Sequence, residues 1–219
     1  MATRRPAWLP FLLTAAIACG GRGAPGGAEP AEAQEPAPPP VAWLSVTPFT
    51  GQKVPVLPMT HLLVPSALAG DSAVAPRERG LAWADSVFGE FLEARMPEVT
   101  WVLPAELRRV ARRAPGMVGD PDRMGQATLR NPRLTTVPDP LRSSLRTLAA
   151  LTDSRFILVP ASVLFDGEPG AVRADAIFVL ADIRTGAIIW RAAPRGEGPT
   201  AAAAYEAAVL QIAPPEAMQ

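Results

Sequence analysis

Beyond residue 40, apolar residues recur along the chain with two different spacings. Apolar side chains three and four positions apart, as in Leu81, Ala84 and Phe88, predict an amphipathic helix. Short continuous apolar runs bounded by Gly, Pro or Asp predict strands. The helical spacing occurs at residues 77–95, 104–114, 140–152 and 200–212. The strand-like runs lie at residues 41–49, 53–59, 99–103, 155–164, 171–182 and 187–192.

Turn-forming residues indicate how these elements connect. Residues 50–52 separate the first two predicted strands. Residues 166–170 and 184–186 contain the Gly, Pro and Asp typical of hairpin turns, so they predict that the last three strands are antiparallel. Residues 60–76 are ambiguous. Residues 116–139 are rich in Gly, Pro, Asp and Arg and predict an irregular excursion.

This order of elements predicts the fold class. Strands and helices are intermixed, and the chain then continues with a run of strands and a final helix. Such an order is typical of the α/β class, with helices packed against a mixed sheet and a carboxyl-terminal antiparallel meander. We therefore expect a single α/β domain at residues 41–213 and a disordered tail at residues 214–219.

The beginning of the chain has the pattern of an export signal. Arg4 and Arg5 form a positive head, and residues 7–18 form an almost uninterrupted apolar stretch. That stretch is too short to span a membrane as a stable helix, but it fits the apolar segment of a secretory leader. A signal peptide is therefore expected at residues 1–18.

The leader closes with small residues directly before the chain's single cysteine, in the sequence Ala16-Ile17-Ala18-Cys19-Gly20. This ending resembles the bacterial lipoprotein signal, although Ala16 stands where leucine is usual. The resemblance implies that the Cys19 thiol receives a diacylglycerol and that the freed amine is acylated, for example with palmitate. Two or three acyl chains anchor a protein stably to a membrane. The alternative is an ordinary secretory signal, cut after one of the alanines, in which Cys19 is incidental.

The lipoprotein resemblance also implies a location. The protein is expected in the cell envelope, held to a membrane through lipidated Cys19. Gly20 rather than Asp after the cysteine resembles the pattern sent to the outer membrane. If the host has two membranes, the expected site is therefore the periplasmic face of the outer membrane.

Residues 20–40 contain no large apolar side chain and consist mainly of Gly, Ala, Pro and Glu. This composition cannot bury enough surface to offset the entropy of ordering, so residues 19–40 are expected to be a lipidated cysteine followed by a disordered linker. Gly21, Gly23 and Gly26 match the spacing GxGxxG. A dinucleotide loop needs a preceding strand and a following helix, and neither is predicted here. No cofactor is therefore expected.

Composition and charge exclude several classes of function. The chain has 21 basic and 21 acidic residues, and removal of Arg4 and Arg5 with the leader leaves 19 basic against 21 acidic. A net charge of about −2 gives no electrostatic basis for binding nucleic acid. One cysteine and one histidine, His61, cannot form an internal disulfide or a histidine-based metal site. We therefore expect a domain stabilised by its apolar core.

Two segments in the last third resemble known periplasmic domains. Residues 151–159 (LTDSRFILV) predict a helix end leading into a strand, and residues 179–190 (VLADIRTGAIIW) place an Asp-x-x-Thr-Gly turn before a strand that ends in Trp190. This pattern resembles the small α/β domains of the curli-secretion lipoprotein, the penicillin-binding-protein activator lipoprotein and the amino-terminal domain of TolB. The resemblance implies a non-enzymatic domain that binds another envelope protein or assembly. Its motifs are structural, so Trp190 is expected to pack against the sheet, and no catalytic residues carry over.

Acidic residues support an alternative, enzymatic hypothesis. The pairs Asp120/Asp122 and Asp166/Glu168 lie in turns rich in Gly and Pro, where carboxylates are normally solvated. Catalysis needs a buried carboxylate with a raised pKa, ideally in a deep pocket. Residues around Asp120 also offer the oxygen ligands that a divalent cation prefers. The alternative function is therefore an envelope hydrolase or small-ligand-binding enzyme that uses acidic residues of the 116–139 excursion. His61, with no GxSxG elbow beside it, is interpreted as a loop or strand-end residue.

The second predicted helix carries four arginines, Arg108, Arg109, Arg112 and Arg113, at spacings that form one ridge. The ridge lies opposite an apolar stripe made of Leu107, Val110, Ala111 and Ala114. Several guanidiniums on one face can bind phosphate, carboxylate or an anionic membrane surface, although a solvated helix face is the simpler interpretation. The favoured hypothesis is a non-enzymatic, lipid-anchored envelope protein whose α/β domain binds another envelope protein. The sequence leaves the partner and the oligomeric state open.

Overall fold

A computed structural model describes residues 41–213 of the chain. The predicted signal peptide, Cys19, the predicted linker and the predicted tail lie outside the described residues. The helices are α1 (Arg77–Arg95), α2 (Pro104–Arg113), α3 (Leu141–Thr152) and α4 (Ala201–Leu210). The strands are β1 (Lys53–Pro55), β2 (Leu62–Leu63), β3 (Thr100–Val102), β4 (Phe156–Glu168), β5 (Ala171–Asp182), β6 (Ala187–Ala192) and β7 (Arg195–Gly198).

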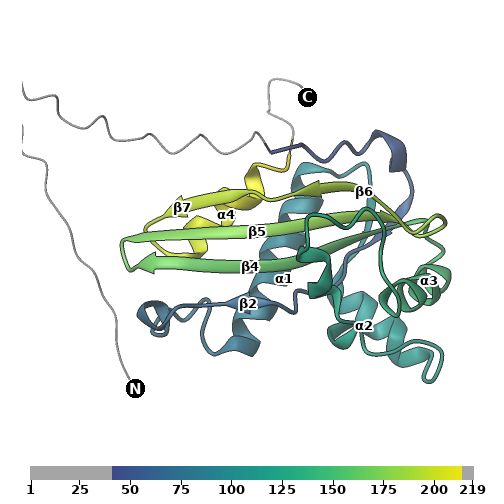
Figure 1. Cartoon of the computed structure of the whole chain (residues 1–219), viewed down its shortest axis with the longest axis horizontal. Coiled ribbons are helices and arrows are strands. Elements are labelled where there is room, and N and C mark those ends of the chain that lie inside the picture. Colours follow the sequence, from purple (N-terminus) through teal and green to yellow (C-terminus); the bar gives the residue numbers. More distant parts are fainter. Residues whose placement is uncertain (1–40, 214–219) are drawn as a thin grey trace, which may run out of the picture. The chain divides into compact units, whose positions relative to one another are not determined.

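Five strands form a mixed sheet (Figure 1). Four of them lie in the order β2-β4-β5-β6, and β7 also pairs with β5. β2 runs parallel to β4, whereas β4, β5, β6 and β7 pair antiparallel. β1 and β3 form a parallel pair, which a bridge between Val56 and Leu158 joins to β4. The predicted mixed sheet with a carboxyl-terminal antiparallel meander is therefore confirmed.

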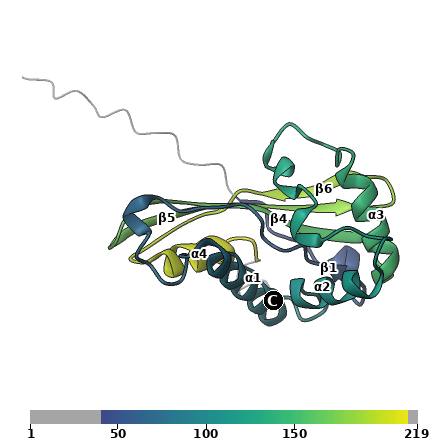
Figure 2. The ribbon, with the colours of Figure 1, turned by 90° about the horizontal axis from the view of Figure 1, so that it is seen from below.

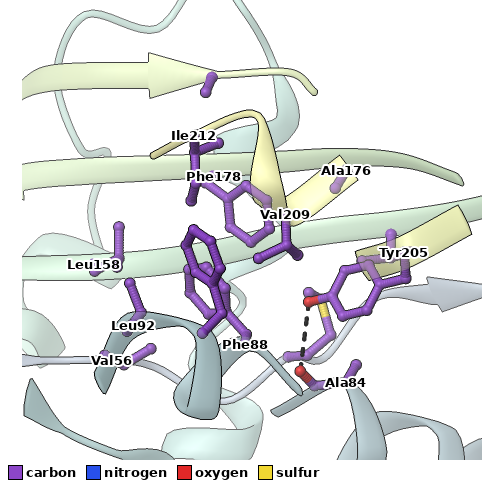
Figure 3. Close-up of a cluster of buried hydrophobic side chains, with 14 of the residues drawn as sticks. Val56, Ala84, Phe88, Leu92, Leu158, Ala176, Phe178, Tyr205, Val209 and Ile212 are labelled. Carbon is purple, nitrogen blue, oxygen red and sulfur yellow. Dashed lines mark hydrogen bonds between the residues drawn. The ribbon is translucent and has the colours of Figure 1, made fainter. Parts of the chain in front are cut away.

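The sheet has an apolar core on each face. α1 and α4 lie together on one face (Figure 2), where Phe88 of α1 stacks on Phe178 of β5 with ring centroids 4.5 Å apart. Tyr205 of α4 is fully buried there, and its hydroxyl donates to the Ala84 carbonyl at 3.4 Å (Figure 3). The second core contains buried residues of α2, α3 and the 116–139 excursion, which lie against Ile157, Val159 and Val179.

Each helix expected from the apolar spacing is present, because that spacing reports directly which face is buried. α1 occupies the predicted residues 77–95, and the other three helices begin or end within a few residues of the predicted bounds. The β4–β5–β6 meander is present as well. β4 continues to Glu168, so its hairpin turn is only Pro169-Gly170.

The predicted strand at residues 41–49 is wrong. Residues 41–46 have no regular secondary structure, and Thr47–Phe49 form a short 3₁₀ helix with Pro48 in its first turn. The run is apolar because Leu44 and Phe49 pack into the core, not because it belongs to a sheet. The strand predicted at 53–59 is likewise shorter and ends at Pro55. Proline has no N–H group for a strand ladder, so Pro55 and Pro58 limit the length of β1.

Two short strands were not predicted. β2 falls in the ambiguous 60–76 segment and contains only Leu62 and Leu63. β7 has the sequence RGEG, which lacks the β-branched and aromatic residues that mark strands. Its glycines are required by packing, since a Cβ atom on Gly196 would lie 2.1 Å from the Ala204 carbonyl oxygen of α4. β7 is therefore set by its pairing with β5 and by its close contact with α4.

Candidate functional site: the arginines of helix α2

Helix α2 begins where its sequence predicts. Pro104 occupies the first turn, where a missing N–H costs nothing, and Leu103 before it is extended. Leu107 is buried in the second core, Ala111 is also buried, and Val110 and Ala114 are half-buried. The predicted apolar stripe therefore fixes the inward face of α2, and its polar residues are left to the remaining surface.

Arg108 does not share the environment of the other three arginines. Its Nε donates to Asp122 Oδ2 at 2.9 Å, and its Nη2 donates to Asp122 Oδ1 at 2.8 Å. The same Nη2 donates to Asp85 Oδ2 at 2.9 Å. Arg108 thus ties α2 both to α1, through Asp85, and to the beginning of the excursion, through Asp122. We call these three residues the Arg108 cluster.

Burial and charge affect the two aspartates of the Arg108 cluster differently. The paired guanidinium lowers the pKa of Asp122 and keeps that carboxylate ionised. The Asp85 side chain is only 8% exposed, and burial raises its pKa to about 6. Hydrogen bonds to Asp85 from the Met59 N–H and from Arg108 act in the opposite direction. Burial is the largest of these effects, and the nearby Asp122 carboxylate also raises the pKa of Asp85.

Arg109, Arg112 and Arg113 are exposed. Among residues 41–213, no carboxylate lies within ion-pair distance of these three guanidiniums. The structure therefore divides the ridge expected from the sequence. Arg108 connects α2 to α1 and to the excursion, and the other three arginines face solvent. We call these three the arginine face.

Two neighbouring features extend the arginine face. A hollow of about 330 Å³ lies between α2 and the excursion; Arg108, Ala111 and Arg112 line it on one side and residues 118–122 on the other. Just beyond the end of α2, the Met117 side chain is 66% exposed. The sequence analysis missed both Met117 and Asp85. No local pattern marks Asp85, because its partners lie more than 20 positions away in the chain.

The 116–139 excursion is irregular, as expected, and it is packed against the domain. It contains two short 3₁₀ helices, Pro121–Arg123 and Gln126–Arg130. Gln126 is buried, and its Nε2 donates to the carbonyls of Pro58 at 3.1 Å and Pro121 at 3.0 Å. Leu129 is buried in the second core. These contacts hold the excursion against the domain without regular secondary structure.

The residues of the two predicted acidic pairs are either exposed to solvent or bonded to other residues of the domain. Asp120 is exposed, and its Oδ1 accepts the Asp122 N–H at 3.0 Å, as a cap of the following 3₁₀ helix. Asp166 pairs with Arg173 at 2.7 Å, and Glu168 is exposed. Within residues 41–213, no group of three His, Cys, Asp or Glu side chains is arranged to hold a metal ion.

His61 and Trp190 make structural contacts. The His61 Nε2 lies 2.8 Å from Arg130 Nη1, and partial burial together with Arg130 and Arg77 lowers its pKa. Trp190 packs against the first core, and its Nε1 donates to the Ala42 carbonyl at 3.0 Å. Trp190 therefore packs as the sequence predicted and also holds the segment that enters the domain.

No helix within the described range 41–213 is long and apolar enough to cross a membrane.

Comparison with known proteins gives similarity only at the level of three-dimensional structure. No protein-family profile matches the chain, and no curated protein matches it. The chain is similar to the C-terminal domain of LpoB from Salmonella enterica, with 16% identity, a TM-score of 0.37, and coverage of 68% of this chain and 84% of that chain. It is also similar to the PelC L103M dodecamer from Paraburkholderia phytofirmans (16% identity, TM-score 0.38, coverage 75% and 86%). The structure of LpoB from E. coli is similar at 16% identity and a TM-score of 0.36, with coverage of 90% and 91%.

LpoB is the penicillin-binding-protein activator lipoprotein, one of the three families in the sequence resemblance. At 16% identity and TM-scores below 0.4, the similarity is limited to a distant likeness of structure. We draw no functional conclusion from it.

Proposed function

We propose that this protein is a non-enzymatic, lipid-anchored envelope protein whose α/β domain binds another envelope protein. The anchor is lipidated Cys19, and the location is the periplasmic face of the outer membrane in a host with two membranes. Residues 20–40 serve as the tether. At about 3.3–3.6 Å per residue, their 21 residues span about 70 Å at full extension, which lets the domain reach a partner away from the membrane.

One observation carries the proposal: Arg108 fixes α2 and leaves three arginines of the same helix exposed. Arg108 pairs with Asp85 of α1 and Asp122 of the excursion, so α2 is held from two sides. The arginine face is therefore presented on a helix whose position is fixed before binding. Arginine is among the residues enriched at protein interfaces and at their binding hot spots. A preorganised arginine face is what a protein-binding domain requires.

The half-buried carboxylate of the excursion is engaged in an ion pair. Asp122, the half-buried member of the Asp120/Asp122 pair, has both carboxylate oxygens bonded to Arg108. A general acid or base needs an oxygen within reach of a substrate proton. Both oxygens of Asp85 are also occupied, by the Met59 N–H and by Arg108.

One feature favours the second candidate, an envelope hydrolase or small-ligand-binding enzyme. Asp85 combines burial with a pKa of about 6, and one guanidinium separates it from Asp122 and the hollow. Perturbed carboxylates of this kind cluster at active sites. Hydrolysis of envelope glycans or peptides by the purified protein, lost on Asp122→Asn, would establish this function in place of the one proposed.

The anchor is tested by the substitution Cys19→Ser in the native host, with Gly20→Ala as a control that keeps the cysteine. We expect wild-type protein and the control to stay in the membrane fraction after a high-salt wash and the Ser variant to appear in the soluble fraction. Mass spectrometry should find acyl chains on the mature amino terminus of the wild type. An unmodified amino terminus would overturn the lipid anchor.

A further inference from the structure

The arginine face is a compact row of like charges. Arg109, Arg112 and Arg113 stand at positions i, i+3 and i+4 of α2, which places their side chains side by side on one face of the helix. Repulsion along such an exposed row is weak, and Arg112 and Arg113 stand in the last turn of α2, where the helix dipole favours positive charge. Within residues 41–213 the three guanidiniums make no ion pair, although Glu106 precedes Arg109 by one turn and Asp120 and Asp122 line the hollow beside Arg112. The row is therefore a solvated group of positive charges that is free to pair with carboxylates of another molecule.

The row lies in a basic part of the domain. Residues 104–152, which include α2, the excursion and α3, contain 9 arginines and 4 acidic residues. The rest of residues 41–213 contains 9 basic and 13 acidic residues. This uneven distribution is hidden by the near-neutral total, and it steers an acidic partner towards the α2 side of the domain.

The chemistry of the face favours a protein over a lipid surface. Arginine forms planar, bidentate pairs with carboxylates, and Arg108 already shows that geometry with Asp122 on the same helix. Met117, 66% exposed, lies four positions after Arg113, and the hollow beside Arg112 is also lined by Asp120 and Asp122. Methionine and arginine are enriched together at protein interfaces. A membrane surface offers headgroup charge but no side chain to fill a hollow of this size.

We propose that Arg109, Arg112, Arg113 and Met117 form the docking face for an acidic surface of the partner protein. Carboxylates of the partner pair with the three guanidiniums, and an apolar side chain covers Met117. This inference rests on the proposed function, because it names the surface through which that protein partner is bound. Asp85 and Asp122 act through Arg108 as positioning residues, since they orient α2 and do not touch the partner.

Site-specific photo-crosslinking in the native host tests the face. A photoreactive phenylalanine analogue is placed at Met117, Ile189 or Leu210 of the full chain; these three apolar side chains are all exposed, at 66%, 48% and 49%. We expect a crosslink to a different protein from Met117 at a yield at least tenfold above the other two positions. Peptide mapping should place it within reach of Asp or Glu residues of that protein.

Matched charge variants then test the arginines. R109Q/R112Q/R113Q removes three positive charges from the face, and K53Q/R79Q/R184Q removes three from exposed sites elsewhere. We expect the first variant to lose at least tenfold in Met117 crosslink yield and the second to retain the wild-type yield. All six side chains are exposed, so both variants should keep the wild-type unfolding temperature, measured by circular dichroism. Should the first variant fail to fold, R109K/R112K/R113K keeps the charges but not the bidentate geometry and should still lose most of the yield.

The outcomes separate this inference from the proposed function. Protein crosslinks from Ile189 or Leu210 with none from Met117 would leave a protein partner in place and overturn the docking face. Crosslinks from Met117 to lipid, or to a second copy of this chain, would also overturn it, as would equal losses in the two charge variants. The absence of a protein crosslink from all three positions would count against the proposed function itself.

Discussion

Asp85 lies where α1, α2 and the excursion meet, and its charge state is set by that position. Its side chain is 8% exposed, and burial raises its pKa from 3.8 to about 6. Asp122, which shares the same guanidinium, has a lowered pKa because it is less buried and receives two hydrogen bonds from Arg108. The pKa values of two carboxylates that share one arginine are thus shifted in opposite directions. The stability of the Arg108 cluster should therefore depend on pH in a way that distinguishes the two residues.

Asp85→Asn should change how stability depends on pH. The raised pKa means that folded Asp85 binds more protons than unfolded Asp85 between pH 3.8 and about 6. Its contribution to stability is therefore fully present below pH 3.8 and is lost as the pH rises through about 6. The free energy of unfolding of the Asn variant, relative to wild type, should rise by about 3 kcal/mol between pH 3.5 and pH 7.

Urea denaturation at half-unit pH steps measures this difference. Asp182→Asn is the control, because the lowered pKa of Asp182 predicts a change only below pH 3.8 and Asp182 pairs with Arg155, not with the Arg108 cluster. A flat difference for Asp85→Asn across pH 4–7 would show that Asp85 is ionised throughout that range.

At the scale of elements, the helices follow from local pattern and β7 does not. α1 spans the 19 residues that its apolar spacing predicts, whereas β7 has no strand-like side chains. β7 is a strand through its pairing with β5, and α4, rich in alanine, lies so close to it that only hydrogen fits at Gly196 and Gly198. A Cβ on Gly198 would lie 2.7 Å from the Cβ of Ala203. β7 and α4 thus meet in a close contact between backbones, which the residue pattern of one sequence cannot reveal.

Gly196→Ala should therefore destabilise the domain. The added methyl would meet the Ala204 carbonyl oxygen at 2.1 Å and the Ala208 nitrogen at 2.3 Å, so backbone must move. We expect a loss of about 2–3 kcal/mol in the free energy of unfolding, measured by urea denaturation. Gly119→Ala is the control, because nothing lies within 4 Å of its added Cβ. Equal stability of the two variants would show that α4 packs less closely than described.

At the scale of the whole molecule, the segment that enters the domain is part of it. Leu44 is buried in the first core, and its N–H donates to the Ile212 carbonyl at 2.8 Å. Trp190 Nε1 donates to the carbonyls of Ala42 and Trp43. The beginning of the described chain therefore contacts β6 and the segment after α4, whereas a domain boundary at residue 41 stays a prediction.

Two truncations test that boundary. A chain beginning at residue 41 should unfold at the same urea concentration as a Cys19→Ser chain beginning at residue 19. A chain beginning at residue 47 loses the burial of Leu44 and the hydrogen bonds to Trp190. It should lose about 2–4 kcal/mol in the free energy of unfolding. An unchanged midpoint for the shorter chain would show that residues 41–46 do not belong to the folded unit.

The sequence alone determined what depends on neighbours along the chain. Apolar spacing located α1, α2, α3 and α4, and turn residues located the β4–β5–β6 meander, because helix faces and hairpin turns are local properties. The same spacing placed the four arginines on α2. The leader, Cys19 and the linker stay predictions, since they lie outside the described residues.

Only the tertiary structure decided which of those arginines are available. Positions 85, 108 and 122 are far apart in the chain and meet only after folding, so no local pattern could separate Arg108 from its neighbours. The run at residues 41–49 was interpreted wrongly for the same reason. Its apolar residues reflect burial against α4 and the sheet, and burial is decided by contacts between distant segments rather than by periodicity.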